Sequence, residues 1–148
     1  MRVPRIRLPA GALRTIRELG ETAWPHEACG LLEGIGGPGV LVRVARALPC
    51  RNVHATPSVR YTIDPEDFLR AEHEARARGL MIVGTWHSHP HGDARPSATD
   101  LAEAWPGWSY VIAGVTNARM QSLRCWRLVD ERFAEQPIAG NSGEVHSR

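Results

Sequence analysis

Lysine is absent from this sequence, and all 18 of its basic side chains are arginine. A Schiff base or a lysine nucleophile needs a side-chain amine, so both kinds of catalysis are excluded. Cysteine is scarce: the three residues are odd in number and widely spaced, which indicates reduced thiols in a cytoplasmic protein. No apolar run is long enough for a membrane span, and no apolar signal core follows the arginine-rich start. We therefore expect neither a membrane anchor nor export.

A strong charge of either sign is also lacking, because 18 basic residues nearly balance 16 acidic ones and leave a net charge of +2. This small excess does not predict nucleic-acid binding. The length of 148 residues, with 43% hydrophobic and 23% charged residues, is typical of one soluble globular domain with a real core. We place that domain at residues 1–135. Residues 136–148 are polar and without pattern, and we expect a mobile tail there.

The stretch from Gly84 to Asp100 concentrates the residues that could bind a metal. Residues 80–86 are mostly apolar and β-prone, which predicts a buried strand that runs into His87 and His89. Because residues i and i+2 of a strand face the same side, the two imidazoles should project together. Pro90 cannot donate to a sheet and should help to end the strand. The strand end is therefore a place where two histidines can share a metal.

The second half of this stretch predicts a short helix with Ser97 as its N-cap, extending to about Trp105. Asp100 falls in the first turn, so two histidines and a carboxylate form a three-ligand set. Catalytic zinc sites commonly have three protein ligands and keep a fourth position for water. The same residues also allow a structural interpretation, since Ser97 and Asp100 fit a capping box and His-x-His pairs occur on surface loops. The residues alone leave both interpretations open.

Two other metal families fit the sequence less well. A His-x-His pair followed by Asp93 is similar to the metal motif of cupins, but cupins are all-β and this chain has clear helical segments. Zinc deaminases need His-x-Glu and Pro-Cys-x-x-Cys, and neither pattern is present. Cys29 lies upstream on a predicted strand, where we expect a small buried thiol.

The complete pattern resembles the signature of the JAMM (MPN-type) metallopeptidase family. The matching positions are His87-Ser-His89-Pro, the residues from Pro90 through Pro96, and Ser97-x-x-Asp100. The family pairs this signature with an upstream glutamate, and the segment Pro25–Leu32 resembles the surroundings of that glutamate, with Glu27 in its place. Arg60–Pro65 resembles the stretch that leads into the middle helix of small bacterial members. The likeness extends from about Ile6 to about Val129.

The resemblance implies a three-layer α/β/α fold related to cytidine deaminases. The order of strands and helices alone indicates only α/β or α+β, with a mixed β-sheet flanked by helices. The resemblance also implies one Zn²⁺ per chain, with His87, His89 and Asp100 as its ligands. Glu27 is then the general base and acid, although without the family it would be interpreted as a surface glutamate. Ser97 is expected to donate a hydrogen bond to the developing oxyanion.

The resemblance to small bacterial members further implies a substrate. These members act on ubiquitin-like sulfur-carrier proteins that end in Gly-Gly, so we expect hydrolysis of an amide or isopeptide bond after such a tail, including release of cysteine made on a carrier. One alternative is a non-catalytic MPN-type binding module, whose expected sign is the loss of metal ligands. Another is a metallohydrolase that acts on other small peptides. The oligomeric state stays open, a homodimer included.

The remaining periodicity and turn residues predict the other elements. We expect an edge strand at residues 2–8, a helix from Pro9 with a glycine stop at Gly20, a loop at 21–25, a hairpin of strands 28–33 and 40–48, an irregular loop at 49–59, a helix at 65–78, and strands at 109–115 and 122–129.

Overall fold

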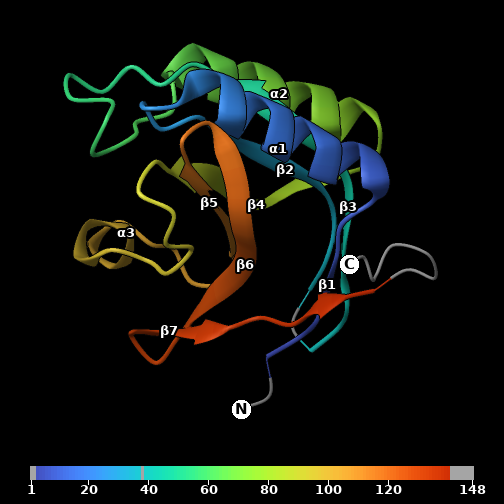
Figure 1. The fold of residues 1–148 in the computed structure, drawn as a ribbon. Coiled ribbons are helices and arrows are strands. Elements are labelled where there is room, and N and C mark those ends of the chain that lie inside the picture. The colour runs from blue at the N-terminus through green and yellow to red at the C-terminus, as the bar shows by residue number, and fades with distance from the viewer. Residues whose placement is uncertain (1–2, 38, 141–148) are drawn as a thin grey trace.

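The computed structural model describes residues 3–37 and 39–140 of the 148-residue chain. In chain order the elements are β1 (Ile6–Arg7), α1 (Ala10–Ala23), β2 (Cys29–Ile35), β3 (Val42–Cys50), α2 (Pro65–Ala77), β4 (Met81–His89), α3 (Ala98–Ala102), β5 (Ser109–Thr116), β6 (Arg119–Val129), β7 (Arg132–Glu135) and β8 (Ile138–Ala139). Figure 1 shows α1 and α2 near one end of the strands, with α3 apart from them beside the sheet. No helix in the described ranges has the length and apolar character needed to cross a membrane.

The strands form one mixed sheet in the order β7-β6-β5-β4-β2-β3-β1-β8. Strand β4 lies near the centre, antiparallel to β2 and parallel to β5. Strand β2 pairs with β4 as far as His87 and β5 pairs with it as far as His89, so β4 is an interior strand of the sheet up to its polar end. The predicted mixed α/β architecture, with a β-sheet flanked by helices, is confirmed.

The two long helices pack on different clusters of the core. Ile16 of α1 belongs to a cluster with Leu32 and Trp86, whereas Ala75 of α2 belongs to a second cluster with Leu31. Leu31 and Leu32 are consecutive residues of one strand, so their side chains point to opposite faces of the sheet. The helices therefore cover opposite faces, and β4 is enclosed between them.

The predicted end of the first helix is wrong. Helix α1 continues through Gly20 to Ala23, so most of the expected loop at residues 21–25 is helical. A Cβ at Gly20 would lie 3.3 Å from the Ser88 Cβ and 3.4 Å from a methyl group of Val115. The glycine lets the helix lie close against β4 and β5, and it does not stop the helix.

The edge of the sheet also differs from the prediction. Strand β1 is not at the edge, because β8 pairs with it in parallel through Ile6 and Ile138. Residues 136–140, which we expected to begin a mobile tail, include this strand and the buried Gln136. The rest of that expected tail, residues 141–148, lies outside the described residues. Strands of two residues such as β1 and β8 carry no detectable alternation, so the sequence could not predict this pairing.

Candidate metal centre

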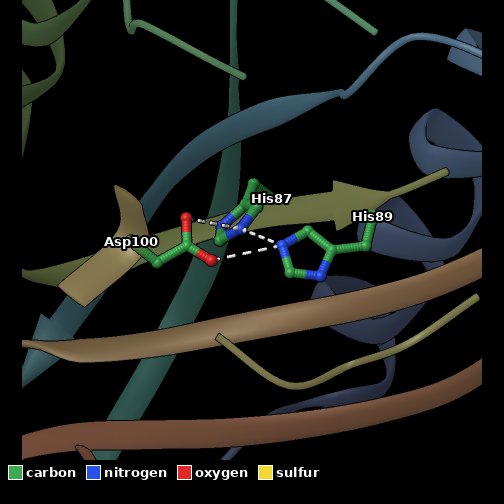
Figure 2. A group of neighbouring side chains, drawn as sticks. All are labelled: His87, His89 and Asp100. Carbon is green, nitrogen blue, oxygen red and sulfur yellow. Dashed lines mark hydrogen bonds and ion pairs between the residues drawn. The ribbon is translucent and has the colours of Figure 1, made fainter. Parts of the chain in front are cut away.

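The last residues of β4 carry the two histidines of the motif. His87 and His89 are 1% and 3% exposed, and their side chains project to the same side of the strand, as the two-residue spacing predicted. Trp86 faces the opposite side and packs in the core cluster beneath α1. The alternation of β4 thus places apolar side chains against one helix and both imidazoles in the space beneath α3 and the loop before α2. Figure 2 shows the two rings and Asp100 pointing toward one another.

The loop between the histidines and α3 is held by side chains from other elements. The indole Nε1 of Trp24 donates to the Pro90 carbonyl at 2.8 Å, and that of Trp126 donates to the Ala94 carbonyl at 3.0 Å. The Ser122 hydroxyl donates to the Gly92 carbonyl at 3.4 Å. These contacts fix the backbone on both sides of the loop, so the start of α3 is held close to the end of β4.

Asp100 takes part in a helix cap and in the histidine cluster at the same time. The Ser97 hydroxyl accepts from the Asp100 N–H at 3.0 Å, and the Ser97 N–H donates to Asp100 Oδ2 at 2.8 Å, which completes the capping box. Asp100 Oδ2 lies 3.2 Å from His89 Nε2, and Oδ1 lies 3.4 Å from His87 Nε2. The structural and the ligand interpretations of the sequence are therefore compatible, because the cap aims the carboxylate at the imidazoles.

The donor atoms converge in a way that suits a cation. His89 Nδ1 lies 2.7 Å from the Asp93 carbonyl, which can only accept, so Nδ1 carries a proton, and in the neutral imidazole the Nε2 lone pair faces the cluster. His87 Nε2 lies 3.0 Å from His89 Nε2. One ligand atom from each of His87, His89 and Asp100 lies within 4.8 Å of the others, the one such group found in the described ranges. Two imidazoles and a carboxylate are ligands that Zn²⁺ accepts, so these residues could hold a metal.

The electrostatics favour positive charge at this point. Burial lowers the pKa of His87, which keeps it in the neutral form that binds metals. Burial acts most strongly on His89 and by itself would lower its pKa. The hydrogen bonds with Asp100 and the Asp93 carbonyl, together with the charges of Asp100 and Glu27, outweigh burial, and the net shift is upward. Hydrogen bonds with the two imidazoles in turn lower the pKa of the Asp100 carboxyl despite its burial. Asp100 thus stabilises a proton between itself and the imidazoles, and a metal ion could take that proton's place.

Glu27 lies at the entry to β2, across from the end of β4. Cys29 is the Cα partner of His87, and the Ser88 N–H donates to the Ala28 carbonyl at 3.0 Å. One residue beyond Ala28 and Ser88, the same register would direct Glu27 to the face that carries His89. The charges of His89 and Asp100 both act on the Glu27 carboxyl, so it lies near the histidine cluster. The Glu27 side chain is 6% exposed, and burial raises its pKa to about 7 although the charge of His89 opposes that shift. The structure thus brings together a buried carboxyl and the histidine cluster.

The buried carboxyl of Glu27 has a measurable consequence for stability. Its folded-state pKa of about 7 lies above its ordinary value of 4.5, so the folded protein binds more protons between these values and loses stability as pH rises through them. We expect Glu27→Gln to stabilise the metal-free protein by about 2 kcal/mol at pH 8 and by little at pH 4.5. Urea unfolding of both proteins at the two pH values measures this difference.

The exposed Glu18 of α1 provides the matched control for this measurement. Glu18→Gln makes the same chemical change on a solvated helix face, and it should leave the free energy of unfolding nearly unchanged at both pH values. Equal stability of the wild type and Glu27→Gln at pH 8 would contradict the raised pKa.

Tyr61 is a site residue for which the sequence predicted no role. Its ring stacks on His87, with centroids 4.4 Å apart and an interplanar angle of 24°. Burial raises the pKa of its hydroxyl, so the ring stays neutral and restricts the orientation of the imidazole. Tyr61 lies in the Arg60–Pro65 stretch that resembled the family, and that likeness was the one available signal. Cys29 is the buried thiol we expected, and burial raises its pKa to about 12.

Residues 9–129 match the family described as prokaryotic homologs of the JAB domain. The chain belongs to this family. The match covers the candidate metal centre together with Glu27, and it confirms the resemblance to JAMM (MPN-type) proteins that the motif indicated.

Three curated relatives of this JAB chain are named as a desampylase, a conjugate cleaving protease and a peptidase. It is 42% identical over 89 residues to a desampylase of Haloferax volcanii, covering 60% of this chain and 62% of that protein. It is 35% identical over 112 residues to a probable TtuB-protein conjugate cleaving protease of Thermus thermophilus, covering 76% and 72%. It is 31% identical over 115 residues to a CysO-cysteine peptidase of Mycobacterium bovis, covering 77% and 76%. The chain thus spans less than two thirds of the desampylase.

Solved structures agree with the JAB assignment. A solution structure of a protein from Desulfitobacterium hafniense superposes with a TM-score of 0.77 at 31% identity, covering 90% of this chain and 91% of that one. A JAB1/MPN domain protein from Archaeoglobus fulgidus superposes with a TM-score of 0.51 at 20% identity, covering 92% and 99%. The second similarity supports the fold alone.

Proposed function

We propose that this JAB-family chain is a zinc-dependent metallopeptidase that hydrolyses an amide or isopeptide bond after the Gly-Gly tail of a ubiquitin-like sulfur-carrier protein. The observation that carries this proposal is the convergence of His87 Nε2, His89 Nε2 and the Asp100 carboxylate beside a buried glutamate. A purely structural cap would not require two buried imidazoles to face the carboxylate. The geometry therefore supports a catalytic centre over a binding module.

In this proposal His87, His89 and Asp100 hold Zn²⁺, which when bound supplies a Lewis acid that polarises the scissile carbonyl and lowers the pKa of water. Glu27 accepts a proton from the attacking water and passes it to the leaving amine. Its raised pKa, about 7, suits a group that must both take up and release a proton near neutral pH. Ser97 accepts the Asp100 N–H through its oxygen, which leaves its own O–H free to donate to the oxyanion.

The names of the relatives support the substrate class. Those names refer to a CysO-cysteine bond, to TtuB–protein conjugates and to desampylation. We propose that the shared requirement is a flexible di-glycine tail, because residues without Cβ atoms can lie extended against a buried metal. The product would be a carrier that ends in Gly-Gly, with cysteine released where cysteine was made on the carrier. The free cysteines in the structure suit a reducing cytoplasm, where we place the protein.

Intact-mass analysis tests this function. A sulfur-carrier protein with a C-terminal extension after Gly-Gly is incubated with the zinc-loaded chain. We expect its mass to fall to that of the form ending in Gly-Gly. A stable mass with zinc demonstrably bound would exclude the carrier as substrate and leave a metallohydrolase of other peptides. An absence of zinc binding would instead favour a non-catalytic module.

A further inference from the structure

We propose that Asn52 is a positioning residue that holds Glu27 over the metal centre. Asn52 stands at the neck of the irregular segment that connects β3 to α2, which we name the 51–63 loop. The inference rests on the proposed function only in taking Glu27 as the proton-transfer group. The contacts that carry it are independent of any substrate.

The side-chain amide of Asn52 uses its full hydrogen-bonding capacity. Nδ2 donates to the Glu27 carbonyl at 2.9 Å and to the Arg60 carbonyl at 3.1 Å. Oδ1 accepts from the N–H groups of His54 at 3.1 Å and Thr62 at 3.0 Å. Two carbonyls face one end of the amide and two N–H groups face the other, so only one orientation of the amide satisfies all four partners. No other residue type of this size offers two donors and an acceptor for two more bonds.

Glu27 needs such a contact because it precedes the sheet. Strand β2 begins at Cys29, two residues later, so no strand pairing holds the Glu27 backbone. Its N–H donates instead to the Pro57 carbonyl at 2.7 Å, and its carbonyl accepts from Asn52. Both backbone bonds of Glu27 thus end in the 51–63 loop, and its place near the histidine cluster depends on that loop.

The same amide also fixes the ring that stacks on a proposed ligand. Arg60 and Thr62, two of its partners, are the immediate neighbours of Tyr61 in the chain. Tyr61 in turn stacks on His87. Asn52 therefore connects the backbone of Glu27 with the support of His87. A displacement of the amide would move the proton-transfer group relative to the metal ligands.

Other contacts hold the 51–63 loop closed without the Asn52 side chain. The Val53 N–H donates to the Thr62 carbonyl at 2.9 Å, and the Asp64 N–H donates to the Arg51 carbonyl at 3.1 Å. Arg51 also forms ion pairs with Asp64 and Asp67. The two ends of the loop are thus joined by backbone hydrogen bonds and ion pairs that do not involve the Asn52 side chain. The contribution specific to Asn52 is its bond to Glu27, and a variant should disturb placement more than folding.

The decisive variant is Asn52→Asp. It keeps the size of the side chain and the acceptor for His54 and Thr62, but it turns an oxygen toward the carbonyls of Glu27 and Arg60. We expect kcat for the extended carrier to fall about 100-fold, as for a misplaced catalytic group, while KM and bound zinc stay near wild type. Amide hydrogen exchange at Glu27 should become faster. Asn52→Ala removes the four hydrogen bonds of the amide without placing an oxygen against the carbonyls. It replaces Asn52→Asp in the same measurements if the Asp variant does not fold.

Gln121 offers a matched control, because its exposed amide donates to the Arg119 carbonyl at 3.4 Å in the β5–β6 hairpin. Gln121→Glu makes the same amide-to-carboxylate change and should leave kcat and the exchange at Glu27 unaltered. A wild-type kcat in Asn52→Asp, or an equal loss from Gln121→Glu, would overturn the proposal. If the wild type itself does not cleave the carrier, the proposed function fails. Amide hydrogen exchange at Glu27 then decides alone. Faster exchange in Asn52→Asp than in the wild type supports the positioning role of Asn52, and unchanged exchange overturns it.

Discussion

Glu27→Gln is expected to reduce hydrolysis by about 10³-fold, the usual contribution of a positioned general base. A glutamine has nearly the same size and can occupy the same buried place at the entry to β2. Its amide cannot accept the proton of the attacking water or deliver a proton to the leaving amine. The reaction therefore loses both proton transfers while the surrounding structure stays in place.

Bound zinc separates this effect from a loss of metal. Glu27 is not among the three residues whose ligand atoms converge, so Glu27→Gln should bind zinc at the wild-type stoichiometry. Kinetics on the extended carrier and metal analysis are run on the same preparations, with Glu18→Gln on the exposed face of α1 as control. Full activity of Glu27→Gln would show that the proposed mechanism is wrong. Loss of zinc would show that Glu27 belongs to the ligand set.

The relative positions of His87, His89 and Asp100 could be predicted from the sequence because local patterns determine them. Alternation along a strand is enough to put His87 and His89 on one face, and the capping pattern is enough to put Asp100 in a first helical turn. Pairing β4 with neighbours on both sides then buries the imidazoles. The structure brings these three side chains together as the spacing indicated, and their role as ligands stays a prediction.

The position of Glu27 could not be derived in the same way. Its place near the histidine cluster depends on the register between β2 and β4, which shifts at an irregularity between Leu32 and Glu33. A shift of one residue would turn Glu27 to the other face of the sheet. No local pattern encodes this register. Only the likeness to a known family connected Glu27 with the histidines in advance.

The roles of polar residues in irregular segments also could not be predicted from the sequence. Asn52 lies in a stretch that has no hydrophobic period, and its amide acts through four backbone groups from residues 27, 54, 60 and 62. Every residue offers the same backbone donor and acceptor groups apart from proline, so the sequence does not show which of them a side chain will bind. Gly20 shows the same limit, because its absent side chain matters only once β4 and β5 lie against α1.

His87→Ala and Asp100→Ala are expected to abolish both zinc binding and hydrolysis. Each removes one of three converging ligands, and the two that remain cannot hold the ion with comparable affinity. His87→Ala also empties a fully buried position beneath the Tyr61 ring, so part of its effect is a loss of packing. Asp100→Ala avoids that cavity but removes one half of the capping box. The two substitutions disturb the fold in different ways, so the effect that they should share is the loss of zinc binding.

Thermal unfolding with and without zinc isolates that shared effect. A ligand that binds only the folded state stabilises it by about 4 kcal/mol when its free concentration is about 1,000 times Kd, so zinc should raise the Tm of the wild type. It should not raise the Tm of either variant, whatever their starting stability. His91→Ala is the control, since His91 follows the pair but is exposed and outside the ligand group. A zinc-dependent rise in Asp100→Ala equal to that of the wild type would mean that its carboxylate serves the helix cap alone.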